Sequence, residues 1–261
     1  MFPIVLMLSL ASALVPAGQS QPPAASGPLT VRVAAAADLK FALDDVIARL
    51  AKRDPSLRVQ TTYGSSGTMH AQLRQRAPYD VYLSADIEYP RDLVSRGVGS
   101  SGDLFTYATG SIVAWVPAGS TLPIERDGVR ALEGAARIAL ANPRHAPYGR
   151  AAEAAMRRAG IWDRVEGRLV LGENVAQAAQ FVESGAADAG IIAKSLAVAP
   201  ALRGKGRFWD IPEDMHPPLT QGGLILPWAA SRGAAVRFRD FLLSSEGRDI
   251  LAAYGLGLPA R

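Results

Sequence analysis

Four short segments of the sequence combine small residues with hydrogen-bond donors, and each lies between a predicted strand and a predicted helix: 34–39, 64–68, 146–149 and 173–175. The first amide groups of a helix have no partner within the helix, and they give its N-terminus about half a positive charge. Several such ends that converge can bind a small anion without lysine or arginine. Any one segment is also explained as a helix cap worth about 1 kcal/mol, so the prediction depends on the whole set.

Side chains within these segments strengthen the pattern. Asp38 and Asn174 stand where a helix N-cap is expected, and Pro147 stands in a first helical turn, where proline is tolerated. Tyr148 follows directly. A buried tyrosine hydroxyl needs a hydrogen-bond partner, and a ligand oxygen would be one.

The elements that must position these segments alternate between strand and helix, which predicts an α/β fold with mostly parallel sheets. The chain has two such series, and its last helix is expected to return to the first series. This predicts one lobe of residues 29–108 with 224–261 and a second lobe of residues 109–223. Ligands bind beyond the carboxyl ends of the strands in such sheets, so we expect a cleft between the lobes. Strands are predicted at 29–36, 57–62, 80–83, 105–116, 138–141, 169–171, 189–192 and 223–226, and helices at 39–50, 68–75, 148–159, 175–184 and 234–253 with a break near 245–247.

Composition excludes several classes of site. The 261 residues include no cysteine, which excludes disulfides, thiolate metal sites, iron–sulfur clusters and cysteine nucleophiles. Of the 28 basic residues only four are lysine, and the arginines are scattered rather than gathered in a stripe with aromatic residues. A nucleic-acid partner is therefore not expected, despite the net charge of +4.

The N-terminal segment predicts export. No charged residue precedes Arg32, residues 2–15 are an apolar run, and residues 16–28 are rich in proline, alanine, glycine and serine. A bilayer span takes about 20 apolar residues, so residues 1–28 are interpreted as a secretory signal peptide and arm, cleaved between Ala17 and Ser26. The alternative is a poorly ordered hydrophobic arm.

Six stretches of the sequence match a known family, in the same order and along nearly the whole chain after residue 28. They are 34–39, 63–67, 77–86, 141–149, 172–179 and 184–190. On these stretches, the chain from residue 29 to its end resembles the periplasmic molybdate-binding proteins of ABC uptake systems, which have the two-lobed type II periplasmic binding protein fold.

The resemblance implies that Ala37, Asp38, Ser66, Tyr148 and Val175 contact a molybdate or tungstate ion through its oxygens. Ser66 and Tyr148 would donate through hydroxyl groups, and Ala37 or Asp38 would act with Val175 mainly through backbone N–H groups. It also implies a periplasmic monomer that is not an enzyme and has no cofactor. After hinge closure, such a protein delivers its anion to an ABC permease in the inner membrane.

Two positions depart from the family pattern. Some members have a tyrosine where this chain has Ala193, and we expect Tyr148 to supply that hydroxyl. Relatives have serine or asparagine where this chain has Asp38. A carboxylate beside a dianion is repulsive, so the side chain either caps its own helix or holds a proton; we expect the cap.

The selectivity expected of a donor-only site follows from protonation and size. Molybdate, tungstate and sulfate carry no proton at neutral pH, whereas hydrogen phosphate needs an acceptor. Only cavity size separates molybdate from sulfate. If Asp38 points into the site, it offers the acceptor that hydrogen phosphate needs, and the site then rejects phosphate less strongly.

Alternatives remain open at this point. A related receptor could bind sulfate, phosphate, ferric ion or a small organic anion. A serine hydrolase would use Ser65 or Ser66 with His70, His145 or His216, although the G-x-S-x-G motif is absent. We expect His145 to be an exposed loop residue.

Overall fold

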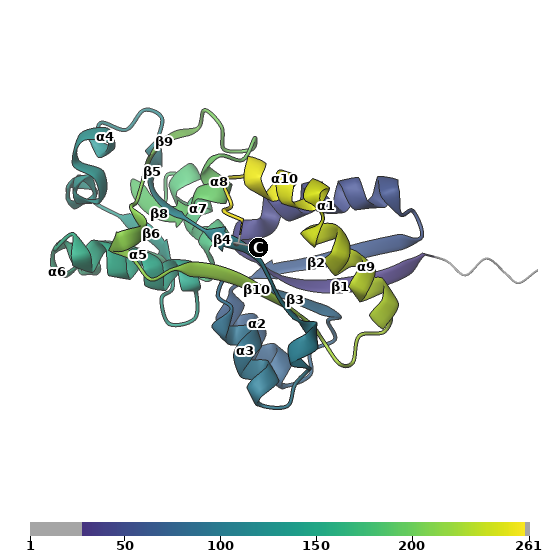
Figure 1. Cartoon of the computed structure of the whole chain (residues 1–261). Coiled ribbons are helices and arrows are strands. Elements are labelled where there is room, and N and C mark those ends of the chain that lie inside the picture. Colours follow the sequence, from purple (N-terminus) through teal and green to yellow (C-terminus); the bar gives the residue numbers. More distant parts are fainter. Residues whose placement is uncertain (1–27, 259–261) are drawn as a thin grey trace, which may run out of the picture.

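The computed structural model describes residues 28–258. The predicted signal peptide, residues 1–28, lies outside the described residues except for Pro28. Within the described range, no helix combines the length and the apolar character needed to cross a membrane. The described elements form two lobes, each built on a five-stranded sheet (Figure 1).

The sheet of the first lobe has four strands in one direction and one, β10, reversed. Residues Val33 to Ala36 of β1 are all buried, as is typical of parallel strands covered on both faces. The strand order is β2 (Leu57–Gly64), β1 (Leu29–Ala36), β3 (Val81–Ser84), β10 (Leu219–Ile225) and β4 (Leu104–Gly110).

Helices cover both faces of this sheet (Figure 1). On one face α1 (Lys40–Arg53), α9 (Arg232–Leu243) and α10 (Ser245–Ala253) bury an apolar cluster that includes Leu43 and Phe238. On the other face α2 (Ser66–Arg74) and α3 (Glu88–Ser95) enclose a smaller cluster. The first turn after β1 is a 3₁₀ helix, η1 (Ala37–Leu39), and not the start of α1.

The second lobe repeats this plan, again with one reversed strand, β5. Its strand order is β7 (Leu169–Gly172), β6 (Ile138–Ala141), β8 (Ala189–Ala193), β5 (Ile112–Pro117) and β9 (Gly206–Asp210). Its helices are α4 (Ile124–Asp127), α5 (Pro147–Arg158), α6 (Trp162–Val165), α7 (Val175–Glu183) and α8 (Lys194–Ala197), with 3₁₀ turns η3 (Gly128–Gly134) and η4 (Glu166–Arg168). Two further 3₁₀ turns, η2 (Ser101–Asp103) and η5 (Glu213–Met215), precede β4 and β10.

The chain crosses between the lobes at two places. Ser111 alone separates β4 of the first sheet from β5 of the second. The return runs from β9 to β10, and β10 pairs with β3 and β4 of the first sheet throughout its length. The expected boundary near residue 223 therefore falls inside a strand of the first lobe. Figure 1 shows β4 and β10 side by side at the junction.

The expected α/β architecture is confirmed, although the short helices α4, α6 and α8 were not predicted and β4 and β5 were predicted as a single strand. Helix α3 was not predicted, and it carries Pro90 within its first turn, where proline is tolerated. Strand β9 was not predicted either, because it is a short edge strand whose residues Arg207 and Asp210 do not look like a buried run.

Candidate functional site

A small cavity lies between the lobes, at the carboxyl ends of β1 and β2 and the N-termini of α2, α5 and α7. The structure brings together all five residues predicted to contact an anion: Ala37, Asp38, Ser66, Tyr148 and Val175. The other lining residues are Ala36, Gly64, Ser65, Ala85, Ala146, Pro147 and Asn174. Asp38 is the one charged residue in this lining, so the wall is otherwise neutral.

Ser66 begins α2 and is 1% exposed. Its Oγ accepts a hydrogen bond from the Ala85 amide at 3.0 Å, and its carbonyl accepts one from the Tyr82 hydroxyl at 2.7 Å. A hydroxyl that accepts from an amide keeps its own proton to donate. The sequence did not point to Ala85, because nothing distinguishes this alanine from the others after a strand.

Asp38 is not the helix cap that we expected. Ala36 is the N-cap residue of η1, no side chain bonds its amides, and Asp38 lies within this turn at 1% exposure. Its Oδ2 instead accepts from the Tyr148 hydroxyl at 3.0 Å and from Gln221 Nε2 at 2.6 Å. The expectation was wrong because β1 continues through Ala36 and turns through a 3₁₀ helix, which places Asp38 two positions after the N-cap residue, too late to cap.

Burial changes the acidity of Asp38. Loss of solvent raises its pKa from 3.8 to about 6, and the hydrogen bonds from Gln221 and Tyr148 offset only part of this effect. Asp38 Oδ1 is buried without a partner among the described residues. With a pKa of about 6, this carboxyl group is mostly ionised at neutral pH and takes up a proton when the pH falls by about one unit.

Gln221 is a site-adjacent residue that the sequence analysis missed. It lies on β10, is fully buried, and donates from Nε2 to both Asp38 Oδ2 and Tyr148 Oη, the latter over 3.0 Å. The signal was present, since a lone amide stands among apolar residues, but the last strand was predicted to begin only at residue 223.

Tyr148 sits in the first turn of α5 and is 3% exposed. Its hydroxyl proton goes to Asp38, and burial together with the neighbouring carboxylate raises the pKa of the hydroxyl well above its usual value. A Cβ added at Gly110 would collide with this hydroxyl, so the crossing strand must have a glycine there. Ala193 is buried at the end of β8 and is not part of the cavity wall.

The start of α7 has the predicted cap. Asn174 Oδ1 accepts from the amides of Ala176 at 3.0 Å and Gln177 at 3.1 Å. Val175 is the first residue of the helix, so its own N–H has no partner inside the helix. That the five residues bind an anion stays a prediction.

Contacts between the lobes surround the cavity. The carbonyl of His145 accepts from the Gly67 amide at 2.9 Å and from Ser65 Oγ at 2.8 Å. Thr68 Oγ1 donates to Glu173 at 2.9 Å, also between lobes. The expectation that His145 is exposed was wrong, because its side chain is only 25% exposed and packs in this contact.

A second contact between the lobes lies farther from the cavity. Arg150 of α5 donates to Asp86 at 2.7 Å and to the Tyr89 hydroxyl at 2.9 Å. Together these contacts hold the lobes in a closed arrangement.

The histidine–serine pair near the cavity is arranged unsuitably for nucleophilic catalysis. Ser65 Oγ donates its proton to the carbonyl of His145. The hydrogen bond of 2.9 Å between His145 Nδ1 and Ser65 Oγ is therefore donated by the histidine, which does not act as a base for this serine. His70 instead bonds Asp92 at 2.7 Å, and His216 bonds the Pro217 carbonyl at 2.8 Å. Within residues 28–258 no group of three potential metal-binding side chains is found.

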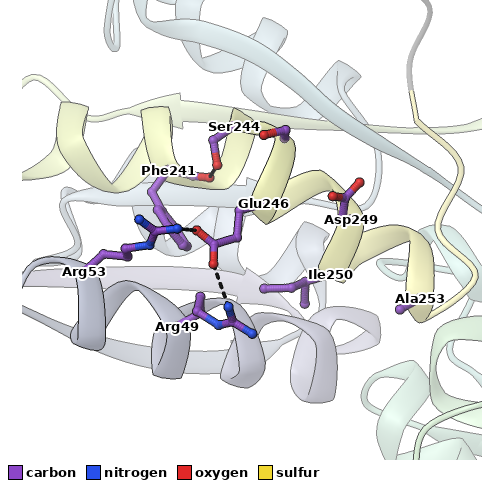
Figure 2. A pocket seen from close by; sticks show the side chains of 9 residues that line it. Arg49, Arg53, Phe241, Ser244, Glu246, Asp249, Ile250 and Ala253 are labelled. Atoms are coloured by element: carbon purple, nitrogen blue, oxygen red, sulfur yellow. Dashed lines mark hydrogen bonds and ion pairs between the residues drawn. The ribbon is translucent and has the colours of Figure 1, made fainter.

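A wider hollow lies on the outside of the first lobe, between α1 and α10 (Figure 2). Its two arginines, Arg49 and Arg53, both pair with the single carboxylate of Glu246, at 2.8 Å and 3.0 Å. These arginines are more than half exposed, and the Glu246 carboxylate already compensates part of their charge. This hollow is a poorer anion site than the cavity between the lobes.

Comparisons with known proteins extend over both lobes. The family described as bacterial extracellular solute-binding protein matches residues 31–257. The molybdate-binding protein ModA of Azotobacter vinelandii is 31% identical over 256 residues, covering 97% of this chain and all of that protein. ModA of Rhodobacter capsulatus is 33% identical over 197 residues, 76% of each chain. The solved structure of the A. vinelandii periplasmic molybdate-binding protein matches with a TM-score of 0.83 and 31% identity, covering 88% of this chain and 100% of that one.

Proposed function

Because the chain belongs to the family of bacterial extracellular solute-binding proteins, we propose that it captures molybdate, or the similar tungstate, between its lobes and delivers it to an ABC permease. The observation that carries this proposal is the cavity itself, where three helix N-termini and Ser66 of the two lobes converge on a wall with no lysine or arginine. The two relatives named molybdate-binding protein support the choice of anion.

The anion is held by neutral donors. Ser66 donates its free hydroxyl proton, and amides in the first turns of α2, α5 and α7 donate along the positive ends of their helix dipoles. Such donors are fixed by the fold, so little is reorganised when the ligand enters. Most of the residues that line the cavity are buried, and the restricted contact with water strengthens each of these bonds.

Binding and closure belong together in this proposal. Ser66 lies on the first lobe, whereas Val175 lies on the second, so an anion that contacts both draws the lobes together about the crossing at Ser111. The contacts of His145 and Arg150 across the lobes support a stable closed form. The protein acts as an exported periplasmic monomer, and the closed form is what the permease recognises.

One observation favours a second candidate. Asp38 Oδ1 is a buried acceptor without a partner among residues 28–258, and hydrogen phosphate carries a proton that needs an acceptor. A monoprotonated oxyanion is therefore the alternative ligand. Sulfate offers no such proton and is smaller than molybdate, so we expect it to bind least well.

A thermal-shift screen of the chain without residues 1–28 tests the function, with molybdate, tungstate, sulfate, phosphate and citrate. A ligand at 100 times its dissociation constant stabilises the folded state by about 2.7 kcal/mol. Ser66→Ala should reduce the molybdate shift, because the free hydroxyl donor is lost. Ser184→Ala is the matched control, since Ser184 is exposed at the end of α7. Equal shifts with sulfate and molybdate would contradict the size argument, and no shift with either metal oxyanion would contradict the function.

A further inference from the structure

Asp38, Tyr148 and Gln221 form a buried cluster at the cavity that has more acceptors than donors. The Tyr148 hydroxyl and the two hydrogens of Gln221 Nε2 supply all the hydrogen bonds within it. Two buried acceptors, Asp38 Oδ1 and Gln221 Oε1, have no partner within the described residues. One additional proton on this cluster would give it the donor that it lacks.

No cation on the described elements compensates the charge of Asp38. Lys40, which directly follows η1 in the chain, pairs with Asp44 at 2.9 Å, and Lys194 at the start of α8 pairs with Asp210 at 2.9 Å. The titratable and charged side chains on the elements packed around η1 or beside the cavity include Lys40 of α1, Tyr63 of β2, Tyr107 of β4, His145 and Tyr148 at α5, Glu173 before α7 and Lys194 of α8.

The tyrosines among these groups do not offer Asp38 a second donor. Tyr63 donates to Asp44 at 2.6 Å, and Tyr107 donates to the Ser84 carbonyl at 3.0 Å. Glu173 is itself an acid and accepts from Thr68. A fully deprotonated oxyanion brings only acceptors and further negative charge into this environment, so it conflicts with an ionised Asp38.

We propose that Asp38 takes up one proton from solvent when the oxyanion binds, so that anion capture is coupled to pH. This inference rests on the proposed function. The proton forms an O–H bond on the Asp38 carboxyl, which then carries no charge and donates within the cluster, to Tyr148 Oη or Gln221 Oε1. Tyr148 no longer has to donate to Asp38, and its hydroxyl proton becomes available to a ligand oxygen.

The size of the effect follows from the acidity of Asp38 in the ligand-free protein. With a pKa of about 6, Asp38 is about half ionised at pH 6 and almost fully ionised at pH 8. If the bound form keeps its proton, the dissociation constant for molybdate rises about fifty-fold from pH 6 to pH 8, approaching tenfold per pH unit. Proton uptake per bound anion rises over the same range from about one half to about one.

Titration calorimetry tests this with the chain lacking residues 1–28 and sodium molybdate. Measurements at pH 6 and pH 8, each in two buffers of different ionisation enthalpy, give the number of protons taken up directly. We expect about one proton at pH 8 for the unmodified protein. Asp38→Asn has no proton to gain, so its affinity should be the same at both pH values and its proton uptake close to zero.

His145→Asn is the control for the histidine near the cavity, because a histidine can also gain charge in this pH range. We expect this variant to keep the fifty-fold dependence. A slope that survives in Asp38→Asn, or that disappears in His145→Asn, overturns the proposal, as does molybdate binding by the unmodified protein without proton uptake. That last result leaves the proposed function intact. No binding of molybdate or tungstate at either pH overturns the function and this inference with it.

Discussion

Replacing Asp38 with asparagine should stabilise the ligand-free protein at neutral pH, and the gain should largely disappear at pH 4. The unmodified protein buries this carboxyl group at 1% exposure, and one of its oxygens has no partner in the part of the chain that the structure describes. Asparagine keeps an oxygen that can accept from Tyr148 and Gln221, and it removes the charge. Comparing the unfolding free energies of the two proteins therefore measures how much burial of the charged carboxylate destabilises the fold.

The sign and size follow from the two pKa values. Asp38 has an ordinary pKa of 3.8 in the unfolded chain and about 6 in the folded protein, so the folded state binds the proton more tightly. Stability then falls as pH rises from about 4 to about 6, and the full cost is about 3 kcal/mol above pH 7. About 2 kcal/mol of this develops between pH 4 and pH 7.

Urea unfolding of both proteins at pH 4, 5, 6 and 7 measures this difference, without any oxyanion present. The difference in unfolding free energy between asparagine and aspartate should grow by about 2 kcal/mol from pH 4 to pH 7. Any constant effect of the substitution cancels in this comparison. Parallel stability curves for the two proteins would refute the reasoning, because they would mean that Asp38 has the same pKa folded and unfolded.

Asp92→Asn is a control of opposite sign. Hydrogen bonds from Arg96 and His70 lower the pKa of Asp92, so its carboxylate stabilises the folded state above its ordinary pKa. That stabilisation is lost as pH falls through the folded pKa. This variant should therefore be less stable than the unmodified protein at pH 7 and converge with it in acid.

Three further substitutions test the positions of the helices and the crossing strand. Gly110→Ala should lower the unfolding free energy by about 1–3 kcal/mol in urea unfolding, because its Cβ would meet a buried tyrosine hydroxyl. Asn174→Ala should cost about 1 kcal/mol by the same measurement, whereas Asn174→Asp keeps the cap and should cost less. Arg150→Ala removes the 2.7 Å ion pair with Asp86 across the lobes, so stopped-flow release of molybdate should accelerate up to about fivefold, the equivalent of about 1 kcal/mol. Arg157→Ala, on the same helix but paired within it, should leave release unchanged.

The architecture could be predicted because each buried strand is a local apolar run. β1 and β6 were predicted with their observed bounds, since every residue that defines them lies within the run itself. The edge strand β9 has no such run, because one side of it faces solvent and its partner β5 is about ninety residues earlier in the chain. Sequence periodicity carries no information about such distant pairing.

The candidate site could be predicted only in part, and Asp38 marks the limit. The small, donor-rich segments identified the region of the site, because helix N-termini are local features, and the family resemblance identified the five residues that the cavity brings together. The partner of Asp38 could not be identified in this way: Gln221 is 183 residues away in the chain. Capping was therefore a reasonable expectation for an isolated aspartate, and only the tertiary fold shows that a nearer donor comes from β10.

In the proposed site, the placement of donors couples closure of the lobes to anion capture. Ser66 belongs to one lobe and the start of α7 belongs to the other, so an anion that accepts from both bridges the lobes. The Tyr148–Asp38 hydrogen bond also spans the lobes, and the Asp38 carboxyl group is buried where they meet. The arrangement of the lobes that brings these donors together is thus the same one that buries Asp38 and raises its pKa. An anion that carries no proton therefore meets the donors and the negative charge of an ionised Asp38 at the same time.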